Sequence, residues 1–130
     1  MIKNNCIFCK IIDGQIPFHK IYEDSFTLAF LDINPKADLH TIVIPKKHST
    51  NILDVSQEDL IATINTVQKI CQYYANNLKI KNLVVRSNAG EKAGQSVMHL
   101  HFHIIPKDCD YPTNISQEFL ANLAKKTAIR

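Results

Sequence analysis

Three histidines stand at alternate positions near the end of the chain, at His99, His101 and His103, with apolar residues between them. Because successive side chains of a β-strand point to opposite faces, an extended backbone would bring the three imidazole rings to one face. A neutral imidazole has one donor and one acceptor nitrogen, so such a row can supply a nucleophile, a proton donor or metal ligands. The alternative is an amphipathic strand whose polar face is histidine-rich, although a solvated face normally carries Lys, Glu or Thr. The pattern favours a chemically active strand face.

Two cysteines, Cys6 and Cys9, lie near the start of the chain with two residues between them. This spacing is half of a tetrahedral zinc site, and zinc would need two further nitrogen or sulfur ligands. A redox pair is the competing interpretation. Thioredoxin-type pairs follow a strand in a βαβ unit, whereas this pair opens the chain, so the position favours a metal site.

The composition limits the class of protein. With 130 residues, 45% of them hydrophobic, the chain is long enough to bury one core without disulfides. The 15 Lys and Arg against 12 Asp and Glu give a net charge of +3, which suits a small anionic ligand and lacks the dense basic stripe of a nucleic-acid-binding protein. No apolar run approaches the roughly 18 residues of a membrane span, and the first residues do not resemble a signal peptide. We therefore expect a cytoplasmic protein with neither nucleic acid nor membrane as partner.

Helical periodicity predicts three helices. A short one at residues 6–13 would end at Gly14. A long one would begin after Ser56, because a serine followed three residues later by an acid, here Asp59, is typical of a helix N-terminus. A last helix is predicted at residues 116–126. The stripe of the long helix that we expect to be buried consists of Leu60, Ile64, Val67, Cys71, Tyr74 and Leu78.

Strands are predicted where apolar and β-branched residues lie between turn signals, at residues 20–23, 27–32, 40–45, 82–87 and 97–105. Short turns join several of them around one long helix, which favours antiparallel pairing over a regular βαβ alternation. The predicted fold class is α+β: a five-stranded, mainly antiparallel sheet with one long helix, a short N-terminal helix and a C-terminal helix. The last strand would carry the three histidines.

These histidines and several other segments resemble the sequence blocks of the histidine triad (HIT) family of nucleotide hydrolases and transferases. The blocks are, in chain order, CIFCKII at 6–12, AFLDINP at 29–35, IPKKH at 44–48, GQSV at 94–97 and HLHFHII at 99–105. The resemblance covers residues 6–107 and is closest to the bacterial histidine triad nucleotide-binding proteins. It implies a single HIT domain over residues 1–130 with a variable tail at 108–130, and a homodimer.

The resemblance also implies a reaction. In the family the middle histidine, here His101, attacks the α-phosphate of a nucleoside 5′-phosphoramidate or an acyl or aminoacyl adenylate. The nucleotidyl-histidine is then hydrolysed by water and AMP is released, which divides one difficult step into two. His103 and His40 would stabilise the developing charge, and Ser96 would contact the leaving group. Nucleophilic attack requires a free lone pair, so we expect the other nitrogen of His101 to donate to a fixed acceptor such as a backbone carbonyl.

For the purine nucleotide, the resemblance places the base against apolar residues, which could equally belong to the core. Asp32 would accept the ribose hydroxyls, and backbone N–H groups near Gly90 would approach the phosphate. The full set of implied nucleotide contacts is Ile7, Phe8, Ile11, Ile16, Phe30, Asp32, Ile33, Asn88, Gly94, Gln95, Ser96, His101 and His103.

In zinc-containing members of the family, the residues that match His48 and His99 complete a structural Cys2His2 site with Cys6 and Cys9. One departure is Leu39, which stands before His40 where the family usually has glycine. A Cβ there is expected to alter the local backbone and shift His40.

Three other functions stay open at this point. One is a dinucleoside polyphosphate hydrolase of the same fold. Another is a metallohydrolase in which His99, His101 and His103 are the catalytic metal ligands. The third is a nucleotide-binding module without catalysis, which would bind AMP and turn over no phosphoramidate.

Overall fold

The computed structural model describes residues 5–107. In chain order the elements are helix α1 (Ile7–Ile12), strands β1 (Lys20–Glu23), β2 (Thr27–Leu31) and β3 (Thr41–Pro45), helix α2 (Gln57–Leu78), strand β4 (Leu83–Arg86), a 3-10 turn (Glu91–Ala93) and strand β5 (Phe102–Pro106). The helix predicted at 116–126 lies outside the described residues.

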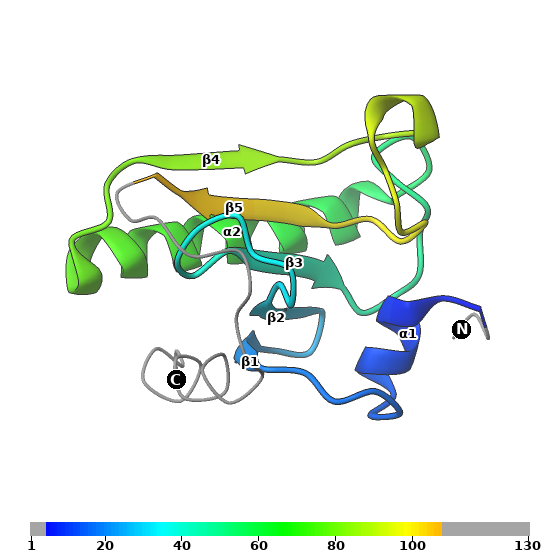
Figure 1. The fold of residues 1–130 in the computed structure, drawn as a ribbon. Helices are drawn as coiled ribbons and strands as arrows, with labels where there is room; N and C mark the ends of the chain where they lie inside the picture. Colours follow the sequence, from blue (N-terminus) through cyan, green and yellow to red (C-terminus); the bar gives the residue numbers. More distant parts are fainter. Residues whose placement is uncertain (1–4, 108–130) are drawn as a thin grey trace.

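The five strands form one sheet in the order β1-β2-β3-β5-β4, and every neighbouring pair is antiparallel (Figure 1). This confirms the predicted α+β class and the five-stranded antiparallel sheet. β5 is an interior strand, because it pairs with β3 on one side and β4 on the other. The histidine His103 is therefore held between two neighbouring strands.

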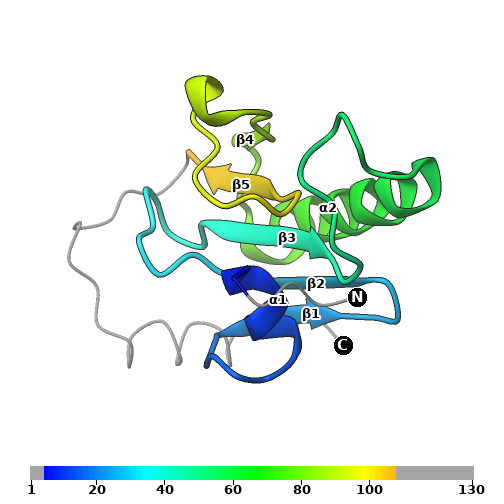
Figure 2. The ribbon, with the colours of Figure 1, turned by 90° about the vertical axis from the view of Figure 1, so that its right-hand side faces the viewer.

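The two faces of the sheet are covered by different helices. The long helix α2 runs behind the sheet in Figure 1, and α1 lies in front of the β1 and β2 end when the molecule is turned (Figure 2). The buried side chains form two clusters accordingly. The α2-side cluster includes Val43, Val67, Ile70, Tyr74, Leu100, Phe102 and Ile104. The α1-side cluster consists of Cys6, Phe8, Cys9, Ile11, Leu28, Phe30, Ile42 and Ile44.

Helix α2 begins as predicted, since the Ser56 side chain accepts a hydrogen bond from the Asp59 N–H at 3.1 Å. Its predicted stripe is partly wrong, because Ile64 and Leu78 are 43% and 38% exposed. The buried face instead includes Thr63 and Thr66 beside Val67, Ile70 and Tyr74.

Hydrogen bonds to the sheet explain this rotation of the buried face. The Thr66 hydroxyl lies 2.8 Å from that of Thr27 on β2, and the Tyr74 hydroxyl lies 2.7 Å from that of Thr41 on β3. A buried hydroxyl that is hydrogen-bonded costs little, so threonine is accepted at the interface. Hydrophobic periodicity counts threonine as a polar residue, so it does not predict that Thr63 and Thr66 are buried.

Strand β5 begins at Phe102, five residues later than predicted. Ladder pairing with β3 extends only from Phe102 to Ile104, and the Leu100 N–H donates to the Ser49 carbonyl at 2.8 Å instead of joining the sheet. The predicted alternation nevertheless holds through this segment: Leu100, Phe102 and Ile104 enter the α2-side cluster. The His101 and His103 rings lie on the other face, with centroids 5.0 Å apart.

Within residues 5–107, no helix combines the length and apolar character needed to cross a membrane.

Candidate active site and metal centre

The buried ring of His101 is held by the backbone two residues before it. Its Nδ1 lies 2.7 Å from the carbonyl oxygen of His99. A carbonyl only accepts hydrogen bonds, so Nδ1 carries the proton and Nε2 keeps its lone pair. Burial lowers the pKa of His101, which keeps the ring neutral at neutral pH. The ring thus has the tautomer that a nucleophilic histidine requires.

A chain of hydrogen bonds sets the tautomers of the other two rings. The Lys36 backbone N–H donates to Nδ1 of His40 at 3.1 Å, so the proton of His40 is on Nε2. That Nε2 lies 3.0 Å from Nδ1 of His103 and donates to it. His103 therefore carries its own proton on Nε2, where it is available for donation to a bound anion.

Both rings of this pair are neutral at neutral pH. Burial, with the positive charges of Arg86 and Lys36, lowers the pKa of His40 to about 4. Burial and the neighbouring His101 and His40 lower the pKa of His103 to about 4 as well. Arg86 on β4 stands directly opposite His103 in the β4–β5 register, so the two side chains share a face. The site is thus positively biased without charged histidines, which favours a phosphate.

Asp32 directly follows β2 and is mostly buried beside this pair. One carboxylate oxygen accepts the Asn34 N–H at 2.9 Å, and the other lies 3.5 Å from Nε2 of His40. Burial raises the pKa of this carboxyl. The Asp32 carboxylate therefore connects His40 to an apolar cavity, which Asp32 also lines.

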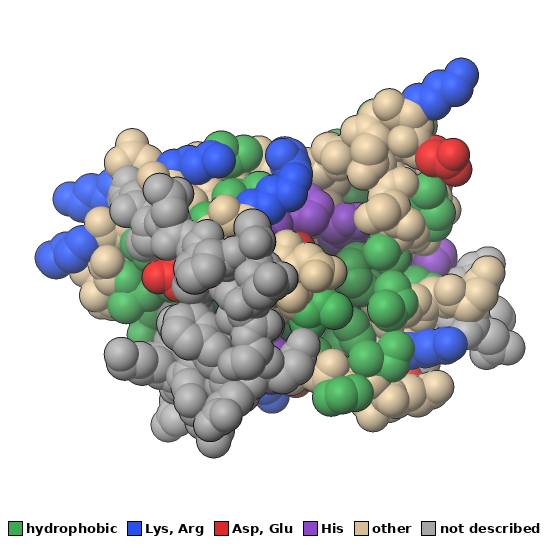
Figure 3. Space-filling model, in the orientation of Figure 1, with side chains coloured by type: hydrophobic (Ala, Val, Ile, Leu, Met, Phe, Trp, Pro, Cys, Tyr) green, Lys and Arg blue, Asp and Glu red, His purple; other side chains and the backbone are tan. Residues whose placement is uncertain are grey.

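An apolar cavity of about 350 Å³ opens in front of His101 and His103. In the space-filling view, histidine side chains lie in a hollow beside a patch of apolar side chains (Figure 3). The cavity brings together the greater part of the predicted nucleotide contacts: Ile7, Phe8, Ile11, Ile16, Phe30, Asp32, Ile33, Ser96, His101 and His103. Phe8, Ile11 and Phe30 also belong to the α1-side cluster, so for them the core and the cavity wall are the same surface.

Six further residues line this cavity that the sequence did not indicate: Pro17, Phe18, Leu31, Asn34, Ile42 and Val97. The sequence carried a signal for Ile42, because it stands two residues after His40 in a segment predicted to be extended, where both side chains face the same side. Phe18 lies outside any helix or strand, with its ring 6.1 Å from that of Phe30, and periodicity carries no signal for it.

Three predicted contacts, Asn88, Gly94 and Gln95, do not line the cavity. The Gln95 side chain accepts from the Gly90 N–H at 2.9 Å and donates to the carbonyls of Thr50 and Val97. The backbone N–H groups of Gly94 and Gln95 donate within the loop, to Glu91 and Gly90. Gln95 thus braces the loop that carries Ser96. Its backbone N–H and that of Gly94 donate within the loop, and their approach to a phosphate stays a prediction.

Gly94 has a local structural role in the same loop. Its φ is +96°, and a Cβ at this position would stand 3.1 Å from the Asn88 side-chain nitrogen. Both the left-handed backbone and the close approach of Asn88 favour glycine.

A second cluster unites the two cysteines with His48 and His99, and the four ligand atoms all lie within 4.8 Å of one another. Cys6 caps the N-terminus of α1 and accepts the Cys9 N–H on its sulfur, so this single helical turn places both sulfurs on one side. Nδ1 of His99 lies 3.4 Å from the Cys6 sulfur, and Nδ1 of His48 lies 3.4 Å from the Cys9 sulfur.

The protonation state of His99 suits a metal ligand. Its Nε2 donates to the Pro45 carbonyl at 2.8 Å, which leaves the Nδ1 lone pair facing the sulfurs. Burial lowers the pKa of His99 to about 4, so the ring is neutral, as metal binding requires. Two sulfurs and two imidazole nitrogens in a buried cluster fit a four-coordinate zinc site.

The catalytic-metal alternative does not fit this arrangement. In the described part of the chain, convergent ligand atoms form two groups, the Cys2His2 cluster and the set of Asp32, His40 and His103, and His101 is in neither. In the second set both nitrogens of His40 are engaged, one as acceptor from Lys36 and one as donor. The three alternating histidines therefore do not converge on one ion.

Curated proteins of known name are similar to this chain in sequence. A curated relative from Bacillus subtilis, named Protein hit, is 48% identical over 103 residues, which are 79% of this chain and 71% of that protein. Another, named adenosine 5′-monophosphoramidase hnt1, from Schizosaccharomyces pombe, is 42% identical over 103 residues, 79% of this chain and 74% of that protein.

Solved structures share the fold. A Hit-like protein from Bartonella henselae, described as involved in cell-cycle regulation, superposes with a TM-score of 0.87 at 40% identity over 98% of this chain and 97% of that one. A Zn-bound histidine triad family protein from Mycobacterium smegmatis superposes with a TM-score of 0.76 at 30% identity over 94% of each chain. The HIT domain family model matches residues 13–110, and the chain belongs to the HIT family.

Proposed function

We propose that this protein hydrolyses purine nucleoside 5′-phosphoramidates or acyl and aminoacyl adenylates through a nucleotidyl group on His101, and releases AMP. The observation that carries the proposal is the hydrogen bond from Nδ1 of His101 to the His99 carbonyl, on a ring that lines the cavity. The monophosphoramidase name of the fission yeast relative supports the substrate class.

In the first step, the Nε2 lone pair of His101 attacks the α-phosphorus. For a phosphoramidate, the phosphorus–nitrogen bond breaks and the amine leaves with the electron pair. Ser96, which lines the cavity, passes it a proton from solvent. Water then attacks the same phosphorus and gives up a proton to solvent. The phosphorus–Nε2 bond breaks with its electron pair returning to His101, so the ring is neutral again and AMP is released.

His103 and His40 stabilise the charge that grows on the phosphate oxygens. Nε2–H of His103 donates to an oxygen, and His40 holds the opposite nitrogen of that ring as an acceptor. The positive field of Arg86 and Lys36 acts in the same direction.

The apolar cavity takes the nucleoside. Its volume of about 350 Å³ is within the range of small-ligand pockets. The purine packs among the Phe8 and Phe30 rings, and Asp32 accepts the ribose hydroxyls with its remaining lone pairs. Asn88, whose side-chain nitrogen lies close to Gly94, is the proposed additional contact to ribose or phosphate.

Zinc is the proposed structural metal, held by Cys6, Cys9, His48 and His99. Bound there it would have no open position, so it supplies stability and no catalytic step. The Zn-bound mycobacterial structure supports this assignment. From the family resemblance we also propose a single domain, a homodimer and a cytoplasmic location.

The test compares wild type with His101→Ala on a fluorogenic adenosine phosphoramidate, with mass spectrometry for an adenylylated histidine. We expect turnover and an adduct on His101 in the wild type alone, while both proteins bind AMP. Equal activity in both would show that His101 is not the nucleophile. An inert wild type that still binds AMP would favour a binding module.

A further inference from the structure

The spacing of Cys6 and Cys9 suits a disulfide as well as a metal site. Cys6 is the N-cap residue of α1, and the backbone N–H of Cys9 donates to its sulfur at 3.3 Å. Residues three apart on a helical turn have Cα atoms about 5 Å apart, and a disulfide requires a separation of about 4.4–6.8 Å. The two sulfurs already lie within 4.8 Å of each other. The backbone of α1 thus brings the two side chains within reach of a covalent bond.

A small reagent reaches Cys6 more readily than Cys9. A cavity of about 420 Å³ is lined by Cys6 and His48, together with Asn5 and Thr50 among others. Cys9 does not line it, and its side chain is 1% exposed against 7% for Cys6. A neutral molecule as small as hydrogen peroxide therefore meets the Cys6 sulfur first, and Cys9 lies behind it.

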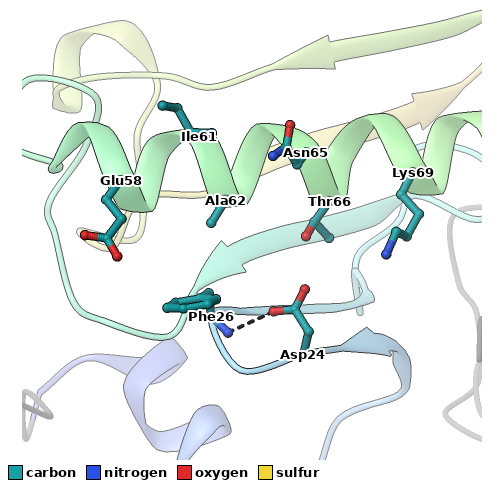
Figure 4. A pocket seen from close by; sticks show the side chains of 8 residues that line it. All are labelled: Asp24, Phe26, Glu58, Ile61, Ala62, Asn65, Thr66 and Lys69. Carbon is teal, nitrogen blue, oxygen red and sulfur yellow. Dashed lines mark hydrogen bonds between the residues drawn. The ribbon is translucent and has the colours of Figure 1, made fainter.

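Two further cavities give no route to this pair. Neither cysteine lines the apolar cavity in front of His101. The third, of about 350 Å³, lies between α2 and the turn after β1, where Figure 4 shows Asp24 and Phe26 below the helix. The described residues that line it include no cysteine. The access to Cys6 is therefore separate from the substrate cavity.

Oxidation of the pair is incompatible with metal binding. A structural zinc site needs four ligands, and its cysteines bind as thiolates. The thiolate is also the form of cysteine that reacts with an oxidant. Once Cys6 and Cys9 share a disulfide, His48 and His99 alone are left of the four ligands. Two imidazoles are too few to hold a structural zinc ion.

We propose that Cys6 and Cys9 form an oxidant-sensitive pair, which hydrogen peroxide converts to a disulfide with release of the bound metal. This rests on the zinc site of the proposed function. The Cys6 thiolate attacks one oxygen of the peroxide, the oxygen–oxygen bond breaks, and hydroxide leaves as the sulfur becomes a sulfenic acid. The Cys9 thiolate then attacks the Cys6 sulfur, the sulfur–oxygen bond breaks, and a second hydroxide leaves. The two sulfurs thus lose two electrons in total, and the peroxide is reduced to two hydroxides, which take protons from solvent to become water.

The disulfide does not replace the structural role of the metal. The metal ligands join α1 to His48, which follows β3, and to His99, which precedes β5. A bond between Cys6 and Cys9 closes only a short loop within α1, and short loops restrict the unfolded chain least. Oxidation therefore lowers the stability of the fold, and a thiol reductant with zinc reverses the change.

The experiment treats the zinc-loaded full-length chain with hydrogen peroxide. A chromogenic chelator measures the zinc released, and mass spectrometry follows the tryptic peptide of residues 4–10, which contains both cysteines. We expect each chain to release its zinc ion, the peptide to lose two hydrogen atoms, and Tm to fall by several degrees. Dithiothreitol with added zinc should restore all three.

The matched control replaces the other two cysteines of the sequence, as Cys71→Ala with Cys109→Ala. It should bind zinc and respond to peroxide as the wild type does. If peroxide left the zinc content and the peptide mass unchanged, or released zinc without a disulfide in the peptide, the redox pair would be refuted while the zinc site stood. A chain that binds no zinc before oxidation, by elemental analysis, would overturn the zinc site and this inference with it.

Discussion

The carbonyl oxygen of His99 accepts a hydrogen bond from Nδ1–H of His101, with 2.7 Å between nitrogen and oxygen, while the His99 ring faces the sulfurs of Cys6 and Cys9. One residue thus belongs to the proposed metal site through its side chain and orients the proposed nucleophile through its backbone. The Pro45 carbonyl holds the other nitrogen of the same ring at 2.8 Å. Position 99 therefore connects the N-terminal helix, β3 and the active histidine.

Metal removal should reduce stability before it affects chemistry. Zinc that binds only the folded chain stabilises it by roughly 3 kcal/mol when its free concentration is 100 times Kd, so a chelator should lower Tm by several degrees. We expect Cys9→Ser to do the same and to lose the bound metal, measured by elemental analysis and thermal unfolding.

Cys71→Ala is the control for that experiment, because this thiol packs on α2 against the core and lies outside the metal cluster. Its metal content should equal that of the wild type. If chelation abolished activity at a temperature where the fold is intact, the structural role of the metal would be refuted.

Acid should destabilise the protein through His40. In the folded protein its pKa is about 4 against an ordinary 6.5, because it is buried and faces Arg86 and Lys36. The unfolded chain therefore binds more protons between these two values. Above about pH 6.5, His40 does not reduce the free energy of unfolding. As the pH falls toward 4, its protonation in the unfolded chain lowers that free energy by about 1 kcal/mol per pH unit.

The neighbours of His40 also affect how the free energy of unfolding depends on pH. His103 has a similarly lowered pKa and adds to the loss. Asp32 has a raised pKa and opposes it, because its folded form prefers the proton. Urea unfolding of wild type and His40→Gln from pH 7 to 4.5 tests the prediction. The variant should show a shallower dependence, and parallel curves would contradict it.

Loss of the His40 donor should slow catalysis more than it weakens binding. In His40→Ala the ring of His103 loses the partner that keeps its Nδ1 an acceptor. We expect kcat for a phosphoramidate to fall by roughly 10- to 100-fold, less than for a donor that touches the oxyanion itself, because His40 acts through His103. KM should change little. A larger effect on KM than on kcat would show that His40 serves substrate binding instead.

At position 39 we expect the glycine variant to be more stable than the alanine variant, which is the reverse of the usual order. Its φ is +61°, a left-handed conformation, and its side chain is 5% exposed in the α2-side cluster. Leu39→Ala removes buried contacts worth about 2–5 kcal/mol and keeps the backbone strain. Leu39→Gly loses the same contacts and relieves about 1 kcal/mol of strain.

We therefore expect Leu39→Gly to melt above Leu39→Ala, although both melt below the wild type. In an ordinary helix or strand position glycine is the less stable of the two. Thermal unfolding of the three proteins decides the point. Leu39 adopts the left-handed conformation that glycine favours, and the His40 ring contacts His103; the shift of His40 caused by the Leu39 side chain stays a prediction.

Local signals in the sequence were enough to predict the existence of the helices and strands within residues 5–107. The Ser56 cap, the five strands and the common face of His101 and His103 depend on residues adjacent in the chain, so a one-dimensional pattern carries them. The proximity of the Cys6 and Cys9 sulfurs also follows from the local sequence, because one helical turn separates the two residues.

Tertiary structure decided whatever depends on a distant partner. The late start of β5 reflects where β3 and β4 are close enough to pair, and the burial of Thr66 reflects the hydroxyl of Thr27 on another element. The tautomer of His99 is set by the Pro45 carbonyl, and that of His103 by the His40 ring, and both partners are distant in the chain. Protonation and polar burial are properties of surroundings, and the surroundings exist only once the chain has folded.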